Sequence, residues 1–494
     1  YPVCIALLWI CNNVLKQRLI SMNISLMKKS NKTLLTILFV ILSCTVVPVT
    51  AKQKNKAPTL SLHEFIKLAT KHDVKFEAIL IDQLSLKHRR DILLPDSDII
   101  MDVKYQYNYY LNQDNNKPEA TVSLSKLFPY NGTQLSLSYN KSASSQLTSD
   151  DSSLQFLITQ PIAKNAFGKG TGLQDKIIGI ENNIRRHQIV EAYEDYLASL
   201  TAAYYNWYSA YENLKVGRSS YKYNQKLMVN ILDRQRQKIA LPIDVNKMKL
   251  LLIDKKENLI VLKEIYENYS NLIFKAIRNK ASSPYIPTTP GQPVTSVNFD
   301  SDYINFTKSS RTYDILNMLE QQGTMQVEKA ADDILPSTNL LLGYQLDGKE
   351  WGIQNEERSY FAGISVRWPF GSNVDKAKQS VAKIEHKKTQ LSNLNKYEDL
   401  HTNLKNIYLQ IQREEKLISV AKQKITLSEA ILKDEAENYS FGKVTLNDYI
   451  VAVNRVDENR FSYTEHSVQL NKLLIEWLRL TDQLVNKDIL KNNN

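Results

Sequence analysis

The chain has 494 residues, of which 43% are hydrophobic and 23% charged, and its formal net charge is +11. Its three cysteines, Cys4, Cys11 and Cys44, all precede residue 52, so the rest of the chain has neither disulfides nor thiolate chemistry. Residues 1–51 also hold five basic and no acidic residues, which leaves +6 for the remainder. The basic balance is therefore mostly a property of the N-terminal segment, and nucleic-acid binding loses its main support.

The N-terminal segment carries the pattern of an export signal. Lys28, Lys29 and Lys32 precede an apolar run at 34–42, and Val49-Thr50-Ala51 supplies small residues for cleavage. We therefore predict a signal peptide at 27–51 and interpret 1–26 as an over-extended N-terminus. A transmembrane anchor is one alternative, although the apolar run is short for a span. A lipoprotein signal ending at Cys44 is the other, although Leu42 fits a lipobox poorly.

The first structural repeat, 52–280, is expected to open with a helix and continue with strands. An apolar stripe predicts a helix over 59–93, ended by Pro95. From about 98 to 160 the period changes to two in about four strand-like runs, around the turn at 129–132. One apolar face rich in tyrosine suits a membrane interface, and the edge of a soluble β-sandwich is the alternative.

Two long helices are predicted next, at about 173–235 and 243–280. Their apolar residues recur at steps of three and four, which is the seam of coiled-coil packing. In the second helix Lys255 fills the one skipped seam position. The first helix would be roughly 95 Å long. Its seam is rich in tyrosine and contains Trp207, and we assign these aromatic side chains to helix packing.

The same order of elements recurs about 240 residues later. A Pro-rich linker at 281–308 leads into a second repeat, 309–484, with strands at about 339–368, long helices at about 375–441 and 446–484, and a polar tail at 485–494. The copies correspond at Leu94-Pro95 and Leu335-Pro336, at Gln160-Pro161 and Trp368-Pro369, and at Asp244 and Asp448. The predicted fold class is mainly α with β, a duplicated helix, β-hairpin and long helical hairpin.

These features together resemble the TolC-like outer membrane efflux proteins. The resemblance rests on the duplicated order, on Leu-Pro before each strand region, on Gln160-Pro161 and Trp368-Pro369 after it, and on Tyr439, Gly442 and Asp448 at the last hairpin. It implies a homotrimer whose strands close one β-barrel in the outer membrane and whose helices continue it as a periplasmic coiled-coil barrel. It also implies a periplasmic adaptor (membrane fusion) protein and an inner-membrane pump of the RND, ABC or MFS type as partners.

The resemblance further implies a constriction where the helical hairpins turn. Tyr439, Asp244 and Asp448 match residues of that constriction, whereas Val444 stands where the family has an arginine. Two more positions depart from the family: Val451 replaces a second ring acid, and Lys238 stands where the second repeat has Gly442. The gate is therefore expected to be held more weakly and to be less anionic. Asp448 also suits the start of a helix, and both roles are compatible.

The predicted function is a passive exit duct, the outer membrane channel of a tripartite efflux or type I secretion system. It would lie in the outer membrane, in contact with lipid, and extend into the periplasm. No enzyme, metal site or cofactor is predicted, because the seven histidines show no ligand spacing and no nucleophile or phosphate motif is present. The alternative is a periplasmic or surface coiled-coil scaffold or adhesin without a channel. Nothing in the sequence identifies the transported substrate.

Overall fold

The computed structural model describes residues 58–72, 74–109, 117–143, 150–278, 285–291, 296–349, 357–369 and 371–485, which belong to one compact unit. The predicted signal peptide, the three cysteines and residues 486–494 lie outside the described residues. Among the described helices, none combines the length and apolar character that a membrane span needs.

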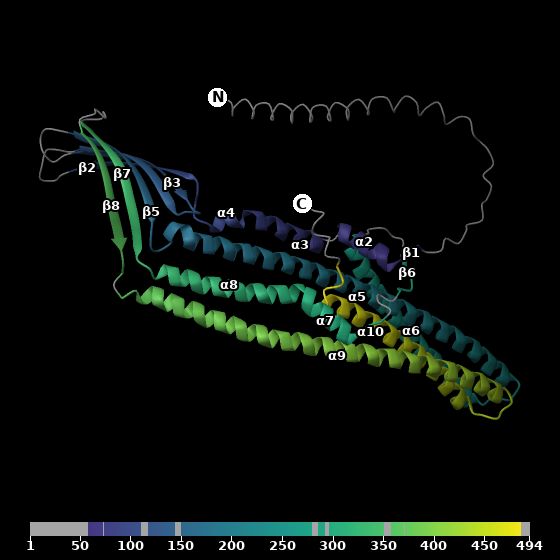
Figure 1. Cartoon of the computed structure of the whole chain (residues 1–494). Coiled ribbons are helices and arrows are strands. Elements are labelled where there is room, and N and C mark those ends of the chain that lie inside the picture. The colour runs from purple at the N-terminus through teal and green to yellow at the C-terminus, as the bar shows by residue number, and fades with distance from the viewer. Residues whose placement is uncertain are drawn as a thin grey trace, which may run out of the picture. The chain divides into compact units, whose positions relative to one another are not determined.

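Four long helices form two hairpins of identical dimensions (Figure 1). Helices α5 (Lys169–Arg236) and α9 (Asn373–Ser440) have 68 residues each, and α6 (Pro242–Ala276) and α10 (Leu446–Leu480) have 35 each. At 1.5 Å per residue, each longer helix extends over about 100 Å. The equal lengths bear out the duplication in the sequence. Helix α5 begins at Lys169, before the expected residue 173, and so includes Gly170 and Gly172.

The shorter helices differ from the sequence prediction. The segment 59–93 is not one helix: it comprises β1 (Thr59–Leu60), α2 (Leu62–His72), α3 (Val74–Ser85), the 3-10 helix η1 (Leu86–His88) and α4 (Arg89–Leu93). Strand β1 pairs in parallel with β6 (Ile286–Pro287), inside the segment predicted as a linker. The linker also contains most of α7 (Phe299–Ser309), which precedes α8 (Arg311–Asp333). Tertiary pairing thus gives the described part of the Pro-rich segment a regular structure.

Six strands form a single antiparallel sheet in the order β2-β3-β4-β5-β7-β8. The strands are β2 (Ile99–Asn108), β3 (Lys117–Phe128), β4 (Thr133–Ala143), β5 (Asp150–Pro161), β7 (Ser337–Lys349) and β8 (Glu357–Arg367). The 3-10 helix η2 (Ala166–Gly168) connects β5 to α5. In Figure 1 the strands gather at one end of the long helices, and the turns of both helical hairpins lie at the other end.

The extra strands of the first repeat lie within this sheet. The sequence left open whether they join the strand wall or form a separate elaboration. Strands β3 and β4 occupy the places between β2 and β5, and β3 pairs with both of its neighbours over nine or more residues. The turn between β3 and β4 lies against the start of α5. The approach is so close that a Cβ added at Gly168 would come within 2.3 Å of the Tyr130 carbonyl oxygen.

Aromatic side chains fill the centre of the helical bundle, as the seam predicted. Trp207 and Tyr204 on α5 are fully buried, and the Trp207 indole Nε1 donates to Ser270 Oγ of α6 at 2.8 Å. The Tyr204 hydroxyl donates to the Leu60 carbonyl at 2.7 Å and so connects α5 to β1. A second cluster surrounds Phe299 and Trp477. These residues are packing residues, and the Trp207 cluster lies in the first half of the chain whereas the Trp477 cluster lies in the second.

Candidate functional site

The six-stranded sheet has one apolar face that runs across all its strands. The register places Val103, Val122, Tyr139, Leu154 and Leu346 in one row, which ends on β8 at Arg358. The next row contains Met101, Leu124, Leu137, Phe156, Tyr344 and Tyr360. The row after it contains Ile99, Lys126, Leu135, Ile158, Leu342 and Ala362, in which Lys126 is the one charged residue. Even on inner strands these side chains stay accessible, with Leu137 39% and Phe156 40% exposed. A contiguous exposed apolar band of this kind calls for a non-aqueous or protein neighbour.

The opposite face of the sheet is polar and mostly uncharged. Its uncharged polar residues come from the alternate positions of the same strands: Ser123, Ser125, Ser136, Ser138, Asn140, Ser153, Gln155, Thr159, Gln345, Ser359 and Ser365. A few charged residues, such as Asp102 and Arg367, and the apolar Leu127, Leu157, Leu341 and Phe361 share this face. Apolar and polar residues alternate along each strand because successive side chains point to opposite faces. A sheet that is apolar on one side and hydroxyl-rich on the other can separate lipid from water.

The far ends of the two helical hairpins have matching turns. Gly442 ends α9 with φ +71°, and its N–H donates to the Tyr439 carbonyl at 3.1 Å. Lys238, the corresponding residue after α5, adopts φ +61° and donates from its N–H to the Gln235 carbonyl at 2.9 Å. The left-handed conformation at a helix end favours glycine. Lys238 therefore keeps the backbone of this turn at a steric cost that Gly442 does not carry.

The two acids predicted at the constriction begin the return helices. Asp448 Oδ2 accepts from the Thr445 hydroxyl at 2.6 Å and from the Thr445 N–H at 3.0 Å. These hydrogen bonds hold the pKa of the exposed Asp448 carboxyl below its ordinary value. Asp244 makes the equivalent contact, since its Oδ2 accepts from the Leu241 N–H at 3.1 Å. The helix-start role is thus present at both positions, and the Asp448 carboxylate stays charged and solvent-exposed at the tip.

Tyr439 lies at the tip beside a cation that the sequence reading missed. The Arg234 guanidinium at the end of α5 lies over the Tyr439 ring, 4.8 Å from its centroid. Arg234 Nη1 also donates to the Ser440 carbonyl at 3.2 Å. Burial raises the pKa of the Tyr439 hydroxyl, Arg234 opposes that rise, and the charge of Asp244 adds to it. We call the Arg234 interactions with Tyr439 and Ser440 the tip contact.

The tip contact joins the two repeats at their tips. Arg234 comes from the first repeat and Tyr439 from the second, whereas the family resemblance implied an arginine on the second repeat at the position of Val444. Behind it, Tyr439 stacks on Tyr449 at 5.5 Å, and the hydroxyls of Tyr449 and Tyr223 are 2.6 Å apart. No sequence motif marks Arg234, since its role depends only on which helix lies opposite.

A buried ion pair occupies the skipped position of the α6 seam. Lys255 Nζ lies 2.8 Å from Asp457 Oδ2 of α10, and these side chains are 15% and 10% exposed. The Ser220 hydroxyl of α5 donates to the same carboxylate oxygen. The polar residue in the seam is therefore an interhelical connection among α5, α6 and α10. Removal of one partner of such a pair would leave an uncompensated buried charge.

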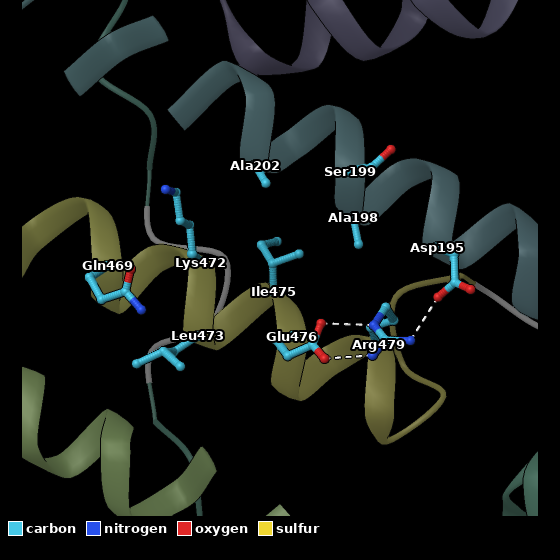
Figure 2. Close-up of a pocket in the computed structure, with 10 residues that line it drawn as sticks. All are labelled: Asp195, Ala198, Ser199, Ala202, Gln469, Lys472, Leu473, Ile475, Glu476 and Arg479. Atoms are coloured by element: carbon cyan, nitrogen blue, oxygen red, sulfur yellow. Dashed lines mark hydrogen bonds and ion pairs between the residues drawn. The ribbon is translucent and has the colours of Figure 1, made fainter. Parts of the chain in front are cut away.

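A pocket of about 570 Å³ lies between α5 and α10 (Figure 2). Arg479 stands at one end of it and bonds to Asp195 Oδ1 at 2.7 Å and to Glu476 Oε2 at 2.8 Å. Ala198 and Ala202 line its α5 side, and burial lowers the pKa of the Lys472 ammonium on its α10 side.

Across the part of the chain that the structure describes, no group of three or more His, Cys, Asp or Glu residues could hold a metal ion.

Comparison with solved structures identifies the fold. The Campylobacter jejuni CmeC outer membrane channel superposes with a TM-score of 0.68 at 12% identity, over 90% of this chain and 93% of that chain. The open state of the Neisseria gonorrhoeae MtrE outer membrane channel gives 0.65 at 12% identity, over 90% and 96%. CusC, described in terms of folding and transmembrane channel formation, gives 0.67 at 10% identity, over 89% and 99%. The chain has the fold of these outer membrane channels.

The resemblance stated from the duplicated motifs is therefore confirmed at the level of fold. No family profile matches the sequence, and no curated protein does. At 10–12% identity, the similarity to these channels is evident in the structure but not in the overall sequence. The mainly α class with β and the duplicated helical hairpins are confirmed. The roles of Tyr439, Asp244 and Asp448 in a constriction stay predictions.

Proposed function

We propose that this protein is the outer membrane channel of a tripartite efflux or type I secretion system. The observation that carries the proposal is the sheet, which is apolar and exposed on one face and polar on the other, attached to helices about 100 Å long. Its strands of 10 to 13 residues are long enough to cross a bilayer when tilted. The protein would act as a passive duct in the outer membrane, and its helices would reach through the periplasm.

The proposed assembly is a homotrimer. A sheet with two open edges leaves backbone groups unpaired, and hydrocarbon does not tolerate that. Sister copies that close the sheet satisfy those groups. The helical hairpins would then form a tunnel around the same axis, with the tips of both repeats at its inner end. An adaptor protein and an inner-membrane pump of the RND, ABC or MFS type would dock there.

The constriction is proposed at those tips. Three copies of the exposed Asp448 carboxylate at one level would attract cations, because like charges converge on the axis. The tip contact would hold the two hairpins of one copy together and so favour the narrow state. Opening of the constriction would require either that Tyr439 and Arg234 separate or that the two hairpins of one copy move outward as a pair with this contact intact.

Membrane fractionation tests the proposal against a scaffold without a channel. We expect the protein in detergent extracts of the outer membrane, as a trimer that resists sodium dodecyl sulfate until heated. Release of the protein in soluble form from the periplasm would support the coiled-coil scaffold or adhesin and would refute the channel.

A further inference from the structure

The sheet contains one hairpin more than the duplication requires. Each repeat runs from Leu-Pro through strands to a second proline, with two strands in the second repeat and four in the first. Strands β2 and β5 therefore correspond to β7 and β8, and β3–β4 is an insertion between them. With one hairpin from each repeat, three copies would supply twelve strands. The insertion raises that number.

The turn of the inserted hairpin is fixed to the end of the sheet that adjoins the helices, which we call its base. The Gln160 side chain of β5 donates from Nε2 to the Asn131 carbonyl at 2.9 Å, and the Thr133 hydroxyl donates to Gln160 Oε1 at 2.6 Å. Gly132 in the same turn has φ +70°, and a Cβ there would come within 2.8 Å of the Pro161 ring. These contacts join the β3–β4 turn to the junction of β5 and α5. The hairpin cannot swing away without breaking them.

The two edges of the sheet match each other. Strands β2 and β8 are the edge strands, and they run antiparallel because the sheet alternates direction over an even number of strands. The apolar face reaches both edges, where Val103 is 64% and Ile364 66% exposed. On the polar face, Asp102 near the base of β2 and Arg367 at the base of β8 carry opposite charges.

We infer that β2 of one copy pairs with β8 of the next, so that three copies close an eighteen-stranded barrel. The inference rests on the proposed trimer but goes beyond it, because it fixes which edges meet and counts β3–β4 as wall. Barrel diameter grows roughly in proportion to strand number, so this barrel would be about one and a half times as wide as a twelve-stranded one. Eighteen strands leave an open aqueous channel. The barrel would therefore pass bulky solutes or chains, and selection would fall to the helical tips.

Cysteine pairs across the predicted edge test the closure. Val103→Cys is combined with Ala362→Cys or Ile364→Cys, which lie on the same face of the sheet. Matched controls combine it with Gly363→Cys or Ser365→Cys on the opposite face. Directly opposed strand residues have the Cα separation that a disulfide needs, and residues on opposite faces do not. The parent without engineered cysteines gives the background.

Oxidation of membranes should give covalent dimers and trimers from at least one same-face pair, at a yield about tenfold above the opposite-face pairs. A trimer by light scattering with no same-face crosslink would overturn the closure and leave the proposed trimer intact. A ladder that stops at the dimer would overturn the count of eighteen. A protein that is not a trimer in detergent would refute the proposed function itself.

Removal of the inserted hairpin gives an independent measurement. Deletion of 117–143 leaves 109–116 and 144–149 as the link between β2 and β5. In a trimer of this variant, the largest polyethylene glycol that enters the outer mouth should fall in radius to about two thirds of the wild-type value. An unchanged limit in a trimer would show that β3–β4 is no part of the wall. Crosslinking of the full chain decides the question if the deletion variant does not fold.

Discussion

Loss of the Arg234 side chain should weaken the tip between the repeats. Arg234→Ala removes a cation 4.8 Å from the Tyr439 ring centroid and a charged hydrogen bond of 3.2 Å to the Ser440 carbonyl. A partly exposed cation–π pair contributes about 1 kcal/mol and a hydrogen bond from a charged group about as much again or more. Together about 2 kcal/mol would be lost, a change of roughly thirtyfold in the equilibrium between closed and open tips.

Single-channel recording of the purified protein in planar bilayers measures this change as an increase in the open fraction. Arg236→Ala is the matched control, because Arg236 is 80% exposed and pairs with Asp233 of its own helix. We expect the control to behave as the wild type, since exposed pairs contribute little. Tyr439→Phe keeps the ring and should also stay near wild type. Equal open fractions for the Arg234 and Arg236 variants would refute the tip contact as a constraint on opening.

Three other substitutions test the tip and the helix seam. Lys238→Gly should stabilise the chain by about 0.5–1 kcal/mol in thermal unfolding, because glycine adopts φ +61° freely. Gly442→Ala should destabilise it by a similar amount. A less stable Lys238→Gly variant or a more stable Gly442→Ala variant would contradict the assigned turns. Lys255→Met alone should cost about 3 kcal/mol, since it leaves Asp457 buried and unpaired, but Lys255→Met with Asp457→Leu should recover most of that loss; a double variant as unstable as the single one would refute the pairing. Asp448→Asn should weaken block of the channel by multivalent cations, because it removes the exposed carboxylate that three copies would bring together on the axis; block that is unaffected by the substitution would exclude Asp448 from the pore.

The sequence was most informative where a short period repeats over many residues. The heptad seams predicted three of the four long helices, and the duplicated order predicted the fourth. Asp244 and Asp448 marked the starts of the return helices because the same capping chemistry recurs in both copies. The alternation of apolar and polar residues in 98–160 likewise predicted the strands of the first repeat. The spacing of apolar residues along one helix or strand is a local property of the chain, so it can be recognised in a single sequence.

Features that depend on partners distant in the chain could not be predicted in the same way. The Pro-rich segment lacks a helical pattern, but the Thr288 N–H donates to the buried Tyr204 hydroxyl and β1 pairs beside it. Arg234 was overlooked because the cation was sought only at the position of Val444. The ring of Tyr439 can accept a cation from any helix that lies opposite it. Which helix does so is decided by tertiary packing.

Channel formation by the wild-type protein tests the central claim most directly. Protein purified from outer membranes is added to one side of a planar lipid bilayer, and the current is recorded at fixed voltage. The account predicts discrete, uniform conductance steps, each from the insertion of one trimer. Trimers that bind the bilayer without any conductance step, in the wild type and in Arg234→Ala alike, would contradict it.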